Sequence, residues 1–427
     1  MIEHNSDAPG LILVGTTDRQ TTRQAAEQHV AELGRLVKTL GYEVLETCIF
    51  GCDKPKVSTL IGSGQVEKLA NLVKEVGARG ITFDDELSPP QQRNLEAATG
   101  TAVTDRHEII LDIFRDHAST HEARLQVERA RLQYTMPRLK RAWTHLSRQR
   151  GGLKGMRGSG ETQLEVDRRQ ITDRIARIDR QLKSVSRHRE TARSKRESIP
   201  VPTIALVGYT NAGKSSLLNA LTGSNVSSRD SLFETLDPKT TRCSLDNGLE
   251  FLLTDTVGFV RKLPHDLVDA FHSTLEETVR ADLLLHVVDA ASPQLNEEVS
   301  TTLSVLEQIG AASCPMISVY NKIDLLEHTV ALPAQRSDRE VTEPVWLSCH
   351  SGEGIDTLRR HIGNFFADRF EDTVFRLPND RWDLVALLHR EARVMDEEAD
   401  GHSVTVRASV PRKLRTALDD FAVADRV

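Results

Sequence analysis

The segment that most constrains the fold of this chain runs from Gly208 to Ser215 and reads Gly-Tyr-Thr-Asn-Ala-Gly-Lys-Ser. It fits the pattern G-x-x-x-x-G-K-[ST], and it directly follows Thr203–Val207, an apolar run typical of a buried strand. Glycines in such a loop let backbone N–H groups turn toward a phosphate. The pattern therefore predicts a phosphate-binding loop between a strand and a helix, in a domain with a mainly parallel sheet.

A second phosphate element is predicted some forty residues later. The strand Phe251–Thr254 leads into Asp255-Thr256-Val257-Gly258, which places a carboxylate at a strand end for a metal shell and a glycine amide for a γ-phosphate. In the first loop, Lys214 is expected to place its charge on the β and γ phosphates, and Ser215 to offer its hydroxyl to Mg²⁺. We therefore expect nucleotide contacts from Gly208, Tyr209, Thr210, Asn211, Ala212, Gly213, Lys214, Ser215, Asp255, Thr256, Val257 and Gly258.

The base-reading element is predicted after the strand Pro315–Tyr320, where the chain reads Asn321-Lys322-Ile323-Asp324. The Asp324 carboxylate can accept hydrogen bonds from the N1 and N2 positions of guanine, and adenine lacks that donor pair. A site built to bond one base edge rejects the other base strongly, so GTP is favoured over ATP. After the next strand, Val345–Leu347, the residues Ser348, Cys349 and His350 are expected to offer a backbone N–H to guanine O6.

Between the two phosphate elements lies a candidate first switch, with Phe233, Glu234, Thr235, Leu236 and Asp237 as expected nucleotide contacts. A threonine of this segment should bind Mg²⁺ only while the γ-phosphate is present. We favour Thr235 for this role, with Thr240 and Thr241 as competitors. All three can instead be ordinary loop hydroxyls.

The group that drives hydrolysis is not evident, because the residue that follows Gly258 is Phe259. Some GTPases orient the attacking water with a glutamine at this position, and a phenylalanine ring cannot do so. We hypothesise that Asn211 helps to hold a monovalent cation, K⁺, beside the phosphates. Asn211 can alternatively cap the loop. The expected catalytic residues are Lys214, Asn211 and Thr235.

The regions before and after this domain have different patterns. Residues 1–118 alternate short apolar runs with helical stretches, which predicts βαβ units and a second mainly parallel sheet. Residues 200–370 form the phosphate-loop domain. Residues 371–427 are expected to form a small α+β domain with a helix over Trp382–Asp396, a strand over Ser403–Ala408 and a further helix from Pro411.

Residues 119–199 form a basic middle region. Lys and Arg exceed Asp and Glu by 12 between Ser119 and Pro200, whereas the rest of the chain carries a net charge of −19. Apolar residues recur at heptad spacing on both sides of the glycine-rich stretch Gly151–Gly160, namely Leu132, Met136, Leu139, Trp143 and Leu146, then Ile171, Ile175, Ile178, Leu182 and Val185. This spacing predicts two helices that form a long antiparallel hairpin, with a kink at Pro137.

The whole chain resembles the HflX family of GTPases, within the Obg-HflX group. The similarity lies in the nucleotide motifs, in the first switch Phe233–Pro238, and in the runs Phe83–Glu96, Leu125–Glu128 and Gly158–Glu165. The resemblance implies a GTP-hydrolysing switch that binds the large (50S) ribosomal subunit and its rRNA. It also implies action in ribosome splitting or rescue under stress, or in ribosome biogenesis.

The partners follow from charge and from the resemblance together. Because phosphate neutralisation dominates RNA affinity, we expect Arg150, Lys154 and Arg157 at the hairpin tip to face RNA. A solvated, charged coiled coil is the alternative. The chain has no signal peptide and no stretch of about 20 apolar residues, so we expect a cytoplasmic monomer. The competing functions are a GTPase that acts in tRNA modification or subunit assembly, and an RNA-binding scaffold with little turnover.

The sequence departs from the family pattern at two places. Cys349 and His350 replace an alanine-led ending of the last guanine loop. Gln65, in Leu60–Gln65, stands where relatives often carry lysine, in a domain suspected of binding a second nucleotide. A tight turn that opens a helix is the alternative interpretation of its glycines, Gly62 and Gly64.

Overall fold

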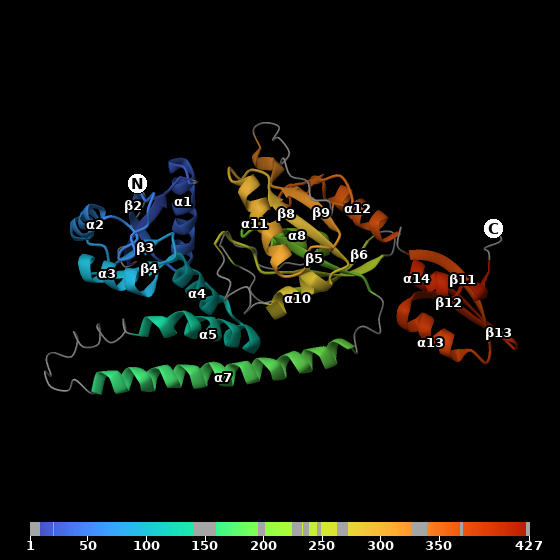
Figure 1. Cartoon of the computed structure of the whole chain (residues 1–427). Coiled ribbons are helices and arrows are strands. Elements are labelled where there is room, and N and C mark those ends of the chain that lie inside the picture. Colours follow the sequence, from blue (N-terminus) through green and yellow to red (C-terminus); the bar gives the residue numbers. More distant parts are fainter. Residues whose placement is uncertain are drawn as a thin grey trace. The chain divides into compact units, whose positions relative to one another are not determined.

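The computed structural model describes residues 9–19, 21–139, 159–194, 201–223, 233, 239–245, 249–262, 272–326, 340–367 and 370–423. Three separate sheets organise these residues. The predicted α/β class is confirmed (Figure 1), and the predicted small α+β region at the C-terminus contains an antiparallel sheet.

The N-terminal sheet has four parallel strands in the order β2-β1-β3-β4. The strands are β1 Gly10–Thr17, β2 Glu43–Gly51, β3 Gly80–Phe83 and β4 Ala102–Asp105. The helices between and after them are α1 Arg23–Thr39, α2 Ser63–Val76, α3 Pro89–Thr99 and α4 Arg106–His117. The predicted alternation of strands and helices is therefore confirmed.

Both faces of this sheet are covered, because alternate residues of β1 meet different helices. Ile12 and Val14 belong to a core that includes Leu69 of α2 and Leu95 of α3. On the opposite face a Cβ added at Gly15 would lie 2.4 Å from Cγ2 of Val30 in α1. Parallel sheets covered on both faces need such continuous apolar strands, and Figure 1 shows α1 and α2 on different sides of the sheet.

Carboxylates at the end of β3 form a buried charge cluster. Arg106 donates to Asp84 Oδ1 and to Glu32 Oε2, each at 2.8 Å, and all three side chains are at most 3% exposed. Lys262 donates to Asp84 Oδ2 at 3.0 Å and to Asp85 Oδ1 at 2.7 Å. Two buried carboxylates and one guanidinium leave an excess negative charge, which the Lys262 ammonium offsets.

The turn around Gln65 fits the tight-turn interpretation. Gln65 Oε1 accepts from the Gly62 N–H at 2.8 Å, and Gln65 Nε2 donates to Gly51 O at 3.1 Å. The side chain thus caps the first turn of α2 and ties it to the end of β2. Binding of a second nucleotide by this domain stays a prediction.

The basic middle region contains two antiparallel helices, α5 His121–Thr135 and α7 Ser159–Ser194. Arg174 makes two hydrogen bonds of 2.7 Å to Glu128, and Arg129 Nε lies 2.7 Å from Asp179 Oδ1. As expected for Pro137, α5 stops and a 3₁₀ turn, η1 Met136–Arg138, replaces it. The glycine-rich break is predicted to reach residue 160, but α7 begins at Ser159, because the serine and a single glycine are tolerated in a first helical turn.

Within α7 the predicted seam and the charges lie on opposite faces. Ile178 is completely buried, and Ile171, Ile175, Leu182 and Val185 are half-buried. At about 3.6 residues per turn, the exposed basic residues fall on the other side of the helix. They are Arg169, Arg177, Arg180 and Lys183, and the exposed Asp173 lies among them, whereas Arg168 lies beside the seam. The predicted seam residues Trp143 and Leu146 lie outside the described residues.

The phosphate-loop domain has a six-stranded sheet in the order β10-β9-β8-β5-β7-β6, parallel except for β6. The strands are β5 Thr203–Gly208, β6 Lys239–Ser244, β7 Glu250–Asp255, β8 Leu283–Asp289, β9 Met316–Asn321 and β10 Val345–Trp346. The helices are α8 Lys214–Thr222, α10 His272–Arg280, α11 Leu295–Gln308, η2 Ile323–Leu325 and α12 Ile355–Ala367. The predicted mainly parallel sheet is confirmed.

The C-terminal region is an antiparallel sheet in the order β12-β13-β11-β14 with helices over one face. Its elements are β11 Phe370–Pro378, α13 Trp382–Glu391, β12 Arg393–Asp400, β13 Ser403–Pro411, α14 Arg412–Ala417, η3 Asp419–Phe421 and β14 Ala422–Val423. The helix predicted over Trp382–Asp396 is wrong beyond Glu391. The acidic residues from Asp396 onward resemble a helical surface, but they form an exposed edge strand paired with β13.

The chain divides into two compact units. The first comprises Met1–Leu182 with Arg229–Asp237 and Lys262–His272, and the second comprises Lys183–Ser228, Pro238–Arg261 and Ser273–Val427. The four-domain boundaries at residues 118, 199 and 370 remain predictions. Among the described residues, none of the helices has the length and apolar character needed to cross a membrane.

Candidate nucleotide-binding site

The phosphate-binding loop joins β5 to α8 through two glycines that no other residue could replace. Gly208 has φ +148°, and a Cβ there would lie 2.1 Å from the carbonyl oxygen of Val287. Gly213 has φ +98°, and its Cβ would lie 2.1 Å from Nδ2 of Asn321. Asn211 also has a positive φ, +61°, a conformation that asparagine tolerates better than most residues. The sequence pattern therefore corresponds to a loop whose backbone shape requires it.

Lys214, the first residue of α8, folds back over this loop. Its Nζ donates to Tyr209 O at 2.7 Å and to Gly208 O at 3.1 Å. The side chain is 6% exposed, and burial lowers the pKa of Lys214 to about 8. The lysine thus lies within the loop, where its ammonium can exchange carbonyl partners for the oxygens of a phosphate.

Ser215 and Asp255 lie together at the end of β7. The Ser215 hydroxyl donates to Asp255 Oδ2 at 2.8 Å, and Asp255 is 1% exposed. The next residue, Thr256, uses its hydroxyl to donate to Leu206 O at 2.5 Å and is completely buried. The Thr256 side chain therefore connects β7 to β5, and only its backbone remains for the predicted nucleotide contact.

The segment after Asp255 lies against the phosphate-binding loop. Phe259 N donates to Gly208 O at 3.1 Å, and Thr210 N donates to Phe259 O at 2.8 Å. Phe259 is 1% exposed, so its ring belongs to the core. This burial explains the phenylalanine by packing and agrees with the expectation that it does not orient water.

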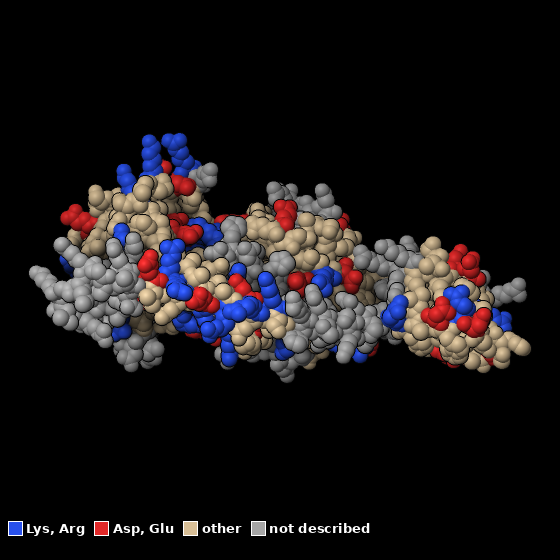
Figure 2. All heavy atoms as spheres, turned by 60° about the horizontal axis from the view of Figure 1, so that its bottom comes forward, with Lys and Arg blue, Asp and Glu red and all other residues tan. Residues whose placement is uncertain are grey.

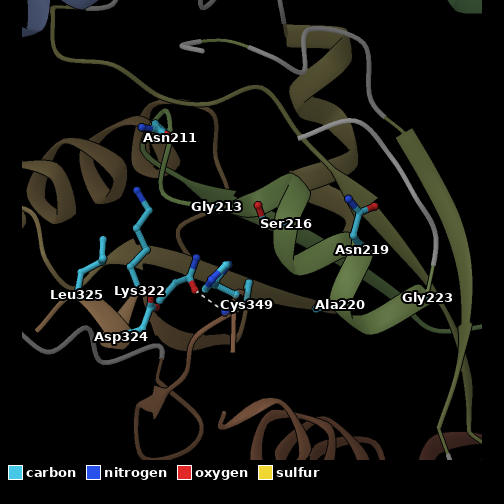
Figure 3. A pocket seen from close by; sticks show the side chains of 12 residues that line it. Asn211, Gly213, Ser216, Asn219, Ala220, Gly223, Lys322, Asp324, Leu325 and Cys349 are labelled. Atoms are coloured by element: carbon cyan, nitrogen blue, oxygen red, sulfur yellow. Dashed lines mark hydrogen bonds between the residues drawn. The ribbon is translucent and has the colours of Figure 1, made fainter. Parts of the chain in front are cut away.

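A cavity of about 600 Å³ opens beside the loop, within the range of small-molecule sites. The residues that line it are Asn211, Gly213, Ser216, Asn219, Ala220, Gly223, Asn321, Lys322, Asp324, Leu325, Cys349 and His350. Figure 3 shows Lys322, Asp324 and Leu325 on one side, and Ser216 and Asn219 of α8 on the other. The pocket thus brings together the three predicted loops that carry Gly213, Asp324 and Cys349.

Asn321 fixes the relative positions of these loops. Its Nδ2 donates to Ala212 O at 3.0 Å, and its Oδ1 accepts from the Cys349 N–H at 3.1 Å. The second of these bonds is drawn in Figure 3. One buried side chain therefore holds the phosphate loop and the last strand loop around the pocket.

The base-reading carboxylate is held ready for hydrogen bonding. A hydrogen bond from Ser348, with smaller effects from neighbouring groups, keeps the pKa of Asp324 below its ordinary value. Lys322 Nζ donates to Asp289 Oδ2 at 2.6 Å. Burial and the nearby Asp324 charge raise the pKa of the Cys349 thiol to about 12. The thiol that lines the pocket is therefore neutral.

The remaining predicted residues are placed as follows. Phe233 is 2% exposed and packs edge-to-face on Phe114 of α4, with ring centroids 4.6 Å apart, inside the first unit. It therefore does not line the pocket as expected. Thr240 and Thr241 lie in β6, where the Thr240 hydroxyl is 2.9 Å from that of Thr254. Glu234, Thr235, Leu236, Asp237, Arg150, Lys154 and Arg157 lie outside the described residues.

The sequence patterns do not point to several residues of the site, among them Ala220, Gly223 and Leu325 of the pocket lining. Ser216 and Asn219 line the pocket from α8, and Asp289 holds Lys322 from the end of β8. The helical spacing of Ser216 and Asn219 after Lys214 gives a usable signal, because residues three apart share a face. Asp289 gives none, because its partner lies 33 residues away in the sequence.

Comparison with protein families gives three adjoining matches. Residues 27–115 match a family described as GTP-binding GTPase N-terminal, and residues 117–196 match the GTP-binding GTPase Middle Region. Residues 203–322 match a family described as 50S ribosome-binding GTPase. The matches therefore run from the N-terminal sheet through the middle helices to the base-reading element.

Relatives of known name cover nearly the whole chain. A GTPase HflX of Spirochaeta thermophila is 44% identical over 89% of this chain and 91% of its own, and the GTPase HflX of Escherichia coli K12 is 42% identical over 91% of each. Among solved structures, a GTP-binding protein of Sulfolobus solfataricus in complex with GDP is 25% identical, with a TM-score of 0.44, and covers 83% of this chain and 98% of that one. On the full-length identities, this chain belongs to the HflX family of GTPases and hydrolyses GTP.

Proposed function

We propose that this GTPase acts on the large ribosomal subunit, in ribosome splitting or rescue or in ribosome biogenesis. The observation that carries the proposal is the basic outer face of α7, formed by Arg169, Arg177, Arg180 and Lys183. Figure 2 shows Lys and Arg gathered along this helix. The description of the matched family, a 50S ribosome-binding GTPase, supports the same partner.

The charges on α7 are arranged for a polyanion rather than for holding the hairpin together. The ion pairs to α5 use Arg174 and Asp179, which border the apolar seam. The four outer basic residues are exposed, and a row of such charges binds RNA phosphates by releasing their counterions. The hairpin can therefore keep its structure while its outer face contacts rRNA.

In the nucleotide site, we assign the γ-phosphate to Lys214 and the backbone N–H of Gly258, and guanine to Asp324. The Ser215 hydroxyl and the Asp255 carboxylate fit Mg²⁺, because both are oxygen donors and lie 2.8 Å apart at the mouth of the loop. The ion, when bound, supplies charge neutralisation for the phosphates. Thr235, of the first switch, remains a further proposed protein ligand.

Asn211 is the proposed contributor to a K⁺ site. It lines the pocket mouth in a left-handed conformation, at the tip of the phosphate-binding loop. GTP turnover should be faster in K⁺ than in Na⁺ buffer, and Asn211→Ala should remove the difference. Equal rates in both salts for the natural chain would refute the K⁺ role.

Sedimentation with purified ribosomal subunits tests the proposed partner. The chain should migrate with 50S subunits in the presence of a non-hydrolysable GTP analogue and much less with GDP. Changing Arg169, Arg177 and Arg180 to Gln should lower binding and flatten its salt dependence, with a slope reduced by about one for each RNA phosphate that the protein no longer neutralises. The matched control changes Arg23, Arg35 and Arg115 to Gln, which removes the same amount of charge from elsewhere on the first unit. Binding to free RNA or to small subunits alone would favour tRNA modification or assembly instead.

A further inference from the structure

The segment Gly258–Arg261 is joined to the phosphate-binding loop by a short seam. Two backbone hydrogen bonds connect Phe259 to Gly208 and to Thr210, at 3.1 and 2.8 Å. Gly258 itself is so close to the loop that an added Cβ would lie 2.8 Å from Thr210 Cγ2 and 3.1 Å from Lys214 Nζ. The position of the Gly258 backbone is therefore set by the loop on one side of it.

A third bond in this seam comes from a side chain. The backbone N–H of Arg261 donates to the Tyr209 hydroxyl at 2.8 Å, across 52 residues of sequence. Tyr209 is 7% exposed and Arg261 is 9% exposed. Arg261 is also anchored through its own side chain, whose Nε lies 3.8 Å from Glu297 Oε1 of α11. Since the other two bonds are made by the backbone, the phenol is the part of the seam that a substitution can remove.

Tyr209 contacts two groups that both respond to a γ-phosphate. Its carbonyl oxygen accepts from Lys214 Nζ at 2.7 Å, and its hydroxyl accepts from the segment that follows Gly258. A lysine of this motif reaches the β and γ phosphates when nucleotide is bound. A γ-phosphate would thus draw Lys214 off the Tyr209 carbonyl while it contacts the Gly258 amide.

We propose that Tyr209 is a positioning residue for GTP hydrolysis, whose hydroxyl fixes the segment after Gly258 so that the Gly258 N–H meets the γ-phosphate. Tyr209 is not among the residues that line the pocket, so its side chain acts through the segment that it holds. Its effect is therefore confined to the state that contains a γ-phosphate. GDP, which lacks that group, does not use the Gly258 amide.

The test is Tyr209→Phe, which removes one oxygen and keeps the ring. A buried neutral hydrogen bond contributes about 1 kcal/mol net, which corresponds to about a fivefold change in affinity. Affinity for a non-hydrolysable GTP analogue should fall about threefold to tenfold, and kcat should fall by a similar factor. Affinity for GDP, measured by titration of a fluorescent GDP, should change less than twofold and so also shows that the pocket is folded.

The matched control is Tyr134→Phe in the first unit. Tyr134 is 6% exposed, and its hydroxyl donates to Asp105 Oδ1 at 3.0 Å, so the variant removes another buried phenol hydroxyl, one that donates to a carboxylate far from the nucleotide site. This variant should lower the unfolding temperature and leave the ratio of analogue to GDP affinity unchanged. A Tyr209→Phe variant that loses GDP and analogue affinity equally, or that keeps full kcat and analogue affinity, would overturn the proposal.

Discussion

At the scale of single residues, the site depends on a few side chains whose surroundings fix their protonation and direction. Asn321 bonds two loops, Lys214 lies within the phosphate loop, and Asp324 is kept ionised by Ser348. The role of each of these three residues could be predicted from its motif. Their internal partners could not, because a motif states which residue faces the ligand and not which neighbour holds it.

Asp324→Asn should change the preferred base. The amide presents a donor where guanine N1 and N2 also donate, so two charge-assisted hydrogen bonds are removed and GDP affinity should fall about 100-fold or more. Xanthine carries an oxygen at the N2 position, and XDP affinity should rise. Competition binding of GDP against XDP measures both changes. Asp356→Asn, on an exposed carboxylate of α12, is the control, and unchanged GDP affinity in Asp324→Asn would contradict the assignment.

His286 of β8 predicts how stability depends on pH. It is 2% exposed, and burial together with the Lys214 charge lowers its pKa from 6.5 to about 4. Between these values the unfolded chain binds a proton that the folded chain does not. The free energy of unfolding should therefore fall as the pH drops from 6.5 to 4, by up to about 3 kcal/mol from this residue.

Urea unfolding of the natural chain and of His286→Gln at several pH values checks this expectation. The variant should have a flatter profile between pH 4 and 6.5, whatever its stability at neutral pH. His402→Gln, at an exposed turn, should keep the natural slope. Identical slopes for the natural chain and His286→Gln would show that the histidine is not the titrating group.

At the scale of elements, the charge cluster at the end of β3 explains much of the family-specific run Phe83–Glu96. Asp84 pairs with Arg106, while Ser88 and Gln91 exchange capping bonds at the start of α3. Leu95 belongs to the core between the sheet and its helices. These contacts give the run a structural role, which the sequence alone could not separate from a binding role.

Arg106→Met should destabilise the N-terminal sheet strongly. It leaves Glu32 and Asp84 as buried carboxylates with too little positive charge, a loss of about 3 to 5 kcal/mol in comparable cases. Arg129→Met, which breaks the half-exposed pair with Asp179, should cost at most about 1 kcal/mol. Urea unfolding compares the two variants, and equal losses would contradict the account of the cluster.

The elements also show where sequence patterns succeed. The β5 strand, the glycine loop and the Asn321–Asp324 run are predictable because each contains or follows an uninterrupted apolar strand. The predicted helix continues to Asp396, into the first half of β12, because the exposed acidic residues of this strand lack a clear period of two. Its strand conformation depends on pairing with β13, and such long-range pairing is not encoded within the segment. For the same reason the sequence does not predict β6, and it places Thr240 and Thr241 of this strand in a loop.

At the scale of the whole molecule, the chain combines a GTP site with a helix that carries a row of exposed basic residues. Phe259 is buried and cannot orient water, and we therefore propose a slow switch that its partner activates. The exposed basic residues of α7 would offer that partner a surface that binds phosphates. Family membership establishes the GTPase activity, whereas the ribosomal role rests on these charges and on the matched family's description.

Single-turnover GTP hydrolysis with and without purified 50S subunits tests this account most directly. The natural chain should be slow alone and strongly stimulated by 50S subunits, because a partner that supplies missing catalytic charge accelerates hydrolysis by about 10³-fold or more. The variant in which Arg169, Arg177 and Arg180 are changed to Gln should keep the unstimulated rate. It should need a higher concentration of 50S subunits to reach the stimulated rate. A natural chain whose rate is the same with and without 50S subunits would contradict the account.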